Sequence, residues 1–131
     1  DEPTAGLDPK ERIRIRNLIS EVAKDKIVII ATHVVTDVEF IAKEIVMLSN
    51  GKIIRSGSPS KLLKELDGKV WNIFLSDNEI DEVNTGYKVS NISRDADGVI
   101  ARIIVDSYDG RWQKEAVRPN LEDLYLYLNG D

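Results

Sequence analysis

The chain has 131 residues, 42% of them hydrophobic and 31% charged, which is the composition of a globular protein rather than a disordered or fibrous one. It contains no cysteine and one histidine, which excludes disulfide frameworks, zinc–cysteine clusters and multi-histidine metal sites. Residues 1–66 carry a net charge of +1 and residues 67–131 a net charge of −6, so nucleic-acid binding by the acidic second part is unfavourable.

The chain opens at Asp1-Glu2-Pro3 without an initiator methionine. We therefore expect it to be a piece of a longer polypeptide, with a processed mature terminus as the alternative.

A helix is predicted to begin at Pro9, because Asp8 can cap it and apolar residues then recur at positions 15, 18, 19 and 22. It should end near Lys24. Residues 26–32 form an almost continuous β-branched run, which is typical of a strand buried on both faces of a parallel sheet. A helix followed by a buried strand indicates an α/β fold class.

Thr36, with Glu39 three residues later, predicts the capped start of a second helix. Two strands at 44–49 and 52–56 flank Asn50-Gly51, a dipeptide that strongly favours a two-residue hairpin turn.

Ser58-Pro59 predicts a short helix that stops at Asp67-Gly68. Beyond this point the pattern changes to that of a small α+β unit. It comprises strands at 70–76, 87–94 and 99–106, a short helix at 79–83, a polar connection at 107–118, and a closing helix capped by Asn120. The boundary divides the chain into residues 1–67 and 68–131.

Three side chains are candidates for chemistry. Asp1 and Glu2 are adjacent carboxylates, and a strand ending just before them would place them at the edge of the sheet where α/β proteins bind ligands. One could hold a metal-bound water while the other orients a nucleophilic water. His33 follows the predicted strand at 26–32 and should lie at the same edge. The alternatives are a solvated acidic pair at a frayed end and a structural or exposed histidine.

These segments together resemble a known family. DEPTAGLDP at residues 1–9, KIVIIATH at 26–33 and SNGKIIRSGSP at 49–59 look like the second half of an ABC ATPase, and more closely like the ATP-binding subunits of ABC-2-type export systems. In that resemblance Asp1-Glu2 matches the end of the Walker B motif, residues 5–8 the D-loop and residues 31–33 the H-loop. Residues 119–128 are similar to the closing helix of an accessory C-terminal domain on these exporters. Lys43-Glu44 departs from the Asp-Arg pair that is more usual in the family.

The resemblance implies that residues 1–67 are the C-terminal part of a P-loop NTPase sheet domain and that residues 68–131 are a small α+β accessory domain. It implies ATP and Mg²⁺ as cofactors. Asp1 would support Mg²⁺ through water, and Glu2 would be the general base or water-orienting group. His33 would contact the γ-phosphate, and Asp8, otherwise explained as a helix cap, would communicate across a dimer interface.

The implied partners are a second ATPase subunit, which would form a homodimer with this one, and a membrane-spanning permease, with no nucleic acid. The resemblance thus implies a cytoplasmic location, peripheral to the inner face of the cell membrane through the permease. Two alternatives remain: a non-transport ABC ATPase of the DNA-repair type, which the acidic residues 69–131 disfavour, and a non-catalytic dimerisation or regulatory module.

The 131 residues contain no G-x-x-x-x-G-K-[ST] loop, no glutamine-bearing Q-loop and no Leu-Ser-Gly-Gly-type signature. We therefore expect this chain alone neither to bind nor to hydrolyse ATP appreciably. The predicted strand at 26–32 also lacks the neighbour that should end at Asp1, so we expect self-association, for example by strand exchange.

Overall fold

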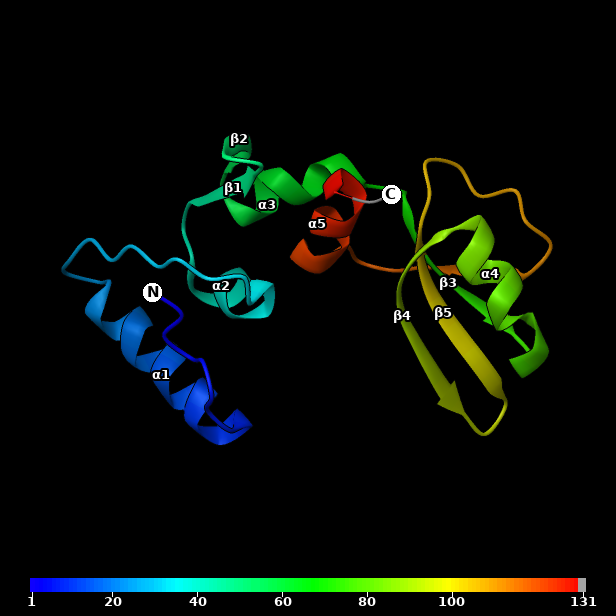
Figure 1. The fold of residues 1–131 in the computed structure, drawn as a ribbon, viewed down its shortest axis with the longest axis horizontal. Coiled ribbons are helices and arrows are strands. Elements are labelled where there is room, and N and C mark those ends of the chain that lie inside the picture. The colour runs from blue at the N-terminus through cyan, green and yellow to red at the C-terminus, as the bar shows by residue number, and fades with distance from the viewer. Residues whose placement is uncertain (130–131) are drawn as a thin grey trace.

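The computed structural model describes residues 1–129, which form an elongated arrangement of helices and two antiparallel sheets (Figure 1). The elements before residue 68 are α1 (Pro9–Val22), α2 (Val35–Ile41), β1 (Ile45–Ser49), β2 (Lys52–Gly57), α3 (Pro59–Leu63) and the 3-10 turn η1 (Lys64–Leu66). Those after it are β3 (Val70–Leu75), the 3-10 turn η2 (Asp77–Glu79), α4 (Ile80–Gly86), β4 (Lys88–Asp95), β5 (Gly98–Ile104), β6 (Gln113–Ala116) and α5 (Leu121–Asn129).

Helix α1 begins as the sequence predicts. The Asp8 carboxylate accepts a hydrogen bond from the Glu11 backbone N–H at 2.9 Å, and Pro9 occupies the first turn, where its missing N–H costs nothing. Helix α1 buries none of its residues fully, so its position depends on polar contacts with α2 more than on apolar packing.

The prediction of a strand at 26–32 is wrong, because these residues form no strand in the described structure. No other described segment forms a ladder with these residues, and Ile27 and Ile29 are 94% and 89% exposed. The segment touches the N-terminal residues through one backbone hydrogen bond, from the Glu2 N–H to the Ala31 carbonyl at 2.7 Å. A β-branched run becomes a strand only when a neighbour accepts its backbone hydrogen bonds. All strand pairings within residues 1–129 are antiparallel, so the expected parallel sheet is not seen there.

Helix α2 is present, but its predicted cap is wrong. The helix starts at Val35, its N-cap residue is Val34, and no side chain caps it. Thr36 therefore lies inside the helix. Glu39 points elsewhere and accepts a hydrogen bond from the backbone N–H of Leu121 at 3.2 Å, a partner that is 82 residues away in the sequence.

The hairpin and the helix that follows it confirm the turn signals. Asn50 and Gly51 have φ angles of 53° and 76°, the two positive values that a type I′ turn requires. Strands β1 and β2 pair on either side, with an irregularity between Met47 and Leu48. Ser58 caps α3 by accepting from the Lys61 N–H at 3.3 Å.

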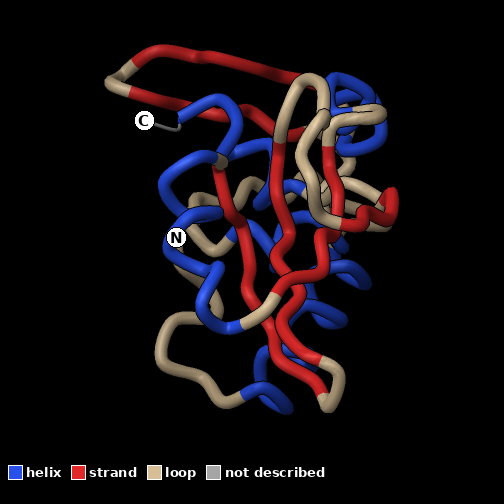
Figure 2. The backbone as a smooth tube through the Cα atoms, turned by 90° about the vertical axis from the view of Figure 1, so that its right-hand side faces the viewer, coloured by secondary structure: helices blue, strands red, loops and turns tan. Residues whose placement is uncertain are grey.

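The second sheet has the strand order β4-β5-β3-β6, and Figure 2 shows its long strands running side by side. Side chains alternate across it, so that one face packs under α4. The buried residues of this core are Ile73, Leu75, Val83, Val99, Ala101 and Ile103. Strand β6 lies inside the predicted polar connection. All four of its residues are exposed at the sheet edge, so they carry no apolar alternation that would predict a strand.

A second core forms where α5 packs against α3 and the start of β3. Its buried members are Leu62, Leu66, Val70, Ile104, Leu121 and Leu124. The predicted cap of α5 is confirmed, since the Asp123 N–H donates to the Asn120 side-chain oxygen at 2.9 Å. Asp123 is itself fully buried and forms an ion pair with Arg102 at 2.6 Å. This core joins residues on both sides of position 67, and the division of the chain at that point stays a prediction.

No helix among residues 1–129 combines the length and the apolar character needed to cross a membrane.

Replacing Leu124 by alanine tests the docking of α5. Leu124 is completely buried, and a cavity of this kind should lower the free energy of unfolding by about 2–5 kcal/mol in urea denaturation. Tyr125→Ala is the control, because Tyr125 is the next residue on the same helix and is half exposed; it should cost less than about 1 kcal/mol. Equal losses in the two variants would contradict this packing.

Candidate functional site

The structure brings Glu2 and His33 together. The Nδ1 atom of His33 lies 2.8 Å from Oε1 of Glu2, and the His33 backbone N–H donates to the same oxygen at 3.1 Å. The second carboxylate oxygen, Oε2, accepts a hydrogen bond from the Thr32 hydroxyl at 3.0 Å. Two residues 31 positions apart thus meet at one carboxylate.

The backbone around this contact is fixed from both sides. The Glu2 N–H donates to the Ala31 carbonyl at 2.7 Å, and the Val34 N–H donates to the Thr32 hydroxyl at 2.9 Å. Glu2 has a φ of 48°, a left-handed conformation that is uncommon for a residue other than glycine. Such a conformation persists where surrounding contacts hold it, and residues of this kind cluster at functional sites.

The electrostatics favour an ionised Glu2. Burial acts to raise the pKa of Glu2, but the hydrogen bonds from the His33 backbone, the His33 ring and the Thr32 hydroxyl outweigh it, so the pKa is lowered. An ionised carboxylate only accepts hydrogen bonds, and Nδ1 of His33 must therefore carry the proton. The other ring nitrogen, Nε2, has no partner within residues 1–129, and the His33 side chain is 89% exposed. That nitrogen is available to a ligand.

The other two candidate residues are placed differently. Asp1 is exposed, and its carboxylate adjoins Glu2 in the chain without a side-chain hydrogen bond in the described structure. Asp8 serves as the cap of α1. No group of three or more metal-ligating side chains occurs within the described range, so Asp1 would be one carboxylate ligand rather than part of a preformed cage.

Sequence reasoning missed the role of Thr32. It bonds to Glu2 through its hydroxyl and also holds the turn into α2, which makes it the link between the two candidate residues. Its position directly before the histidine was the available signal. A hydroxyl there can reach a carboxylate only if the loop bends back, however, and the sequence does not reveal that bend.

Comparisons with known proteins concern the sequence of the chain rather than the geometry of this site. No family model matches the chain. It is 39% identical over 62 residues to ABC transporter A family member 8 of Dictyostelium discoideum, which covers 47% of this chain and 7% of that protein. It is 40% identical over 79 residues to human ATP-binding cassette sub-family A member 9, covering 60% of this chain and 5% of that protein. It is 48% identical over 63 residues to the energy-coupling factor transporter ATP-binding protein EcfA2 of Mycoplasmoides gallisepticum, covering 47% and 20%.

The homologues of this chain are ABC transporter ATP-binding proteins. The chain spans less than a quarter of the length of each of these relatives.

A groove of about 720 Å³ lies away from the Glu2–His33 contact. It runs between the end of α1, residues 26–30 and the start of β1, and its lining is mostly aliphatic. Neither Glu2 nor His33 lines it, so the groove is not where the candidate chemistry takes place.

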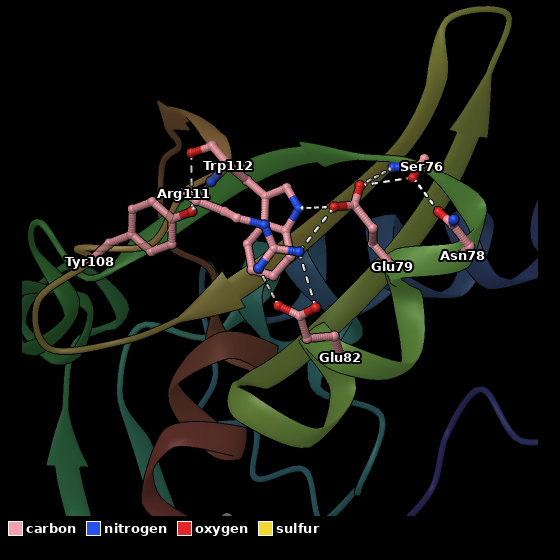
Figure 3. Close-up of polar contacts among 7 residues, drawn as sticks. All are labelled: Ser76, Asn78, Glu79, Glu82, Tyr108, Arg111 and Trp112. Atoms are coloured by element: carbon pink, nitrogen blue, oxygen red, sulfur yellow. Dashed lines mark hydrogen bonds and ion pairs between the residues drawn. The ribbon is translucent and has the colours of Figure 1, made fainter.

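A second polar cluster joins the loop after β5 to α4 (Figure 3). Oε1 of Glu79 accepts from the Ser76 N–H at 2.9 Å, while Oε2 accepts from the Trp112 indole at 2.9 Å and from Arg111 at 3.1 Å. Arg111 also bonds to Glu82 and lies over the Trp112 ring, 4.2 Å from its centroid. Because the carboxylates and the guanidinium in this cluster bond to one another, it is a structural brace rather than a ligand site.

The brace predicts an acid-dependent stability. Hydrogen bonds from the Ser76 backbone, the Trp112 indole and the Ser76 hydroxyl lower the pKa of Glu79 to about 2. Because the pKa of Glu79 is lower in the folded state, its ionised carboxylate stabilises the fold fully at pH values above 4.5, the pKa of the unfolded state. This stabilisation is lost as the pH falls toward 2 and the carboxylate becomes protonated. The melting temperature of the wild type should therefore fall more steeply between pH 5 and about pH 2 than that of Glu79→Gln.

Asp81→Asn is the matched control, because Asp81 is an exposed acid on α4 outside the brace. Calorimetry at a series of pH values measures both variants. Parallel pH profiles for the wild type and Glu79→Gln would show that Glu79 does not contribute in this way.

Proposed function

We propose that this chain is part of the ATP-hydrolysing subunit of an ABC exporter, an enzyme that energises transport through a separate membrane permease. The observation that supports it best is the contact between Glu2 and His33, which joins the residues that resemble the Walker B and H-loop motifs at 2.8 Å. The homologues support the coarser part of this proposal, because they are transporter ATP-binding proteins.

The geometry suits phosphoryl transfer, in which catalysis is mainly positioning and charge stabilisation. Glu2 is ionised and held by three donors, so its carboxylate can orient a water molecule and accept its proton. His33 is fixed through Nδ1, which leaves Nε2 to contact the terminal phosphate. Glu2 thus acts on the nucleophile and His33 acts on the phosphoryl group.

The donor set fits the implied cofactors in part. Mg²⁺ prefers oxygen ligands and is usually held by one or two carboxylates together with phosphate oxygens and retained waters. Asp1 is an exposed carboxylate next to Glu2, which suits a contact through water. When bound, Mg²⁺ would neutralise charge on the phosphates of ATP.

The proposed partners follow from the same resemblance. Asp8 would lie at the interface with a second ATPase subunit, and the pair would dock on a permease at the cytoplasmic face of the membrane. The resemblance of residues 119–128 to the accessory domain of exporters favours transport over DNA repair.

Replacing Glu2 by glutamine in the full-length protein tests the proposed enzyme. Loss of a general base typically costs a factor of about 10²–10⁴, so kcat for ATP hydrolysis should fall by that amount while ATP still binds. Glu21→Gln is the control, since Glu21 is an exposed acid on α1 that pairs with Lys24, and it should keep the wild-type rate. Wild-type turnover in Glu2→Gln would overturn the assignment.

The 131-residue chain by itself should not bind nucleotide. It contains no glycine-rich loop whose backbone amides could hold phosphates, so isothermal titration with Mg-ATP should give no binding heat at micromolar concentrations. The full-length protein is the positive control. A micromolar dissociation constant for the short chain would contradict the prediction and point to a phosphate site outside the family pattern.

A further inference from the structure

A buried carboxylate lies one turn beyond the candidate site and takes no part in the chemistry described above. Asp37, in the first turn of α2, is 4% exposed and follows His33 by four residues. It accepts a hydrogen bond from the hydroxyl of Thr4, which is equally buried. Burying a carboxylate is unfavourable unless it is paired, so these partners determine how the two segments meet.

Helix α1 completes the surroundings of Asp37. Arg12 lies 3.3 Å and Arg16 4.0 Å from Oδ1, while Thr4 bonds to Oδ2. Arg16 also lies over the ring of Phe40, 5.2 Å from the ring centroid, and Phe40 is on α2 like Asp37. The carboxylate therefore ties α1, α2 and the N-terminal loop to one another.

Thr4 is only two residues from Glu2, and the residue between them is Pro3. The proline ring fixes its own φ and restricts the residue before it, so the link from Thr4 to Glu2 is short and stiff. Glu2 itself is in the left-handed conformation. Such a conformation needs support on both sides, and here the Ala31–His33 segment holds Glu2 from one side and Asp37 holds Thr4 on the other.

We propose that Asp37 is a positioning residue, whose bond to Thr4 sets the orientation of the Glu2 carboxylate toward His33. The two contacts join the same two segments at neighbouring points. Glu2 bonds to His33 and Thr4 bonds to Asp37, with one residue between Glu2 and Thr4 and three residues between His33 and Asp37. Removing the Thr4–Asp37 bond leaves Glu2 attached at one end only. The catalytic consequence rests on the proposed function, whereas the structural link does not.

The first test uses the fact that His33 is the only histidine, so its ring signals in a ¹⁵N–¹H NMR spectrum need no further assignment. The wild type should show the tautomer with the proton on Nδ1. In Thr4→Val and Asp37→Asn the ring is less firmly held, and the ratio of the two tautomers should shift toward the Nε2–H form by a factor of about 2–10, the usual worth of one hydrogen bond. Thr4→Ser keeps the hydroxyl and should keep the wild-type spectrum.

Asp123→Asn is the matched control for lost stability, because Asp123 is also a buried aspartate paired with an arginine but lies on α5 rather than on α2. It should leave the His33 signals unchanged. If Asp37→Asn does not fold, the comparison of Thr4→Val with Thr4→Ser decides. An unchanged His33 spectrum in Thr4→Val overturns the proposal.

The second test measures ATP hydrolysis by the full-length protein. Thr4→Val should lower kcat by about 10–100-fold, the effect expected of a small misplacement, with little change in KM, and Thr4→Ser should restore it. A changed His33 spectrum with unchanged kcat would show that Asp37 is structural only and overturn its catalytic role. Absence of hydrolysis by the wild type would instead refute the proposed function, while the NMR result still decides the link from Asp37 to His33.

Discussion

The candidate site depends on the hydrogen bonds that the Glu2 carboxylate accepts from residues 32 and 33. A single charged group accepts hydrogen bonds from a backbone N–H, a hydroxyl and an imidazole, all within residues 32–33. The contact is partly exposed, so its value lies less in stabilisation than in orientation. Two donors bond to Oε1 and one to Oε2, which restricts how the carboxylate can turn. Because the ring is held through Nδ1, the same contact leaves Nε2 as the histidine nitrogen without a partner in the described residues.

The two ends of the molecule are stabilised differently. Around α1 and α2 few apolar side chains are buried, and ion pairs and caps fix the geometry. In the sheet and around α5, two clusters of fully buried aliphatic residues supply the stabilisation, with the Arg102–Asp123 pair enclosed beside them. The candidate chemistry thus sits on the less densely packed end. Such regions open at lower free energy than a core does, which suits segments that must respond to a ligand.

Sequence reasoning succeeded where the determining contacts are local. The cap at Asp8, the turn at Asn50-Gly51 and the cap at Asn120 each depend on residues within one turn, and all three are confirmed. It failed where a distant partner decides. Residues 26–32 have strand composition but no neighbour in the described chain, and Glu39 leaves its expected cap to bind Leu121. Glu2 and His33 were expected to lie close together at a common sheet edge; they do meet, but through loops, because residues 26–32 form no strand in the described structure. Thr32 and Asp37 became evident only once these loops were placed.

The position of α5 has a consequence for biosynthesis. Leu62 and Leu66 complete their core only with Leu121 and Leu124, which are made some sixty residues later. At translation rates of about 5–20 residues per second, those early leucines stay uncovered for several seconds on the ribosome. The nascent chain therefore presents a temporary apolar surface at the segment that ends at Leu66, until α5 has been made.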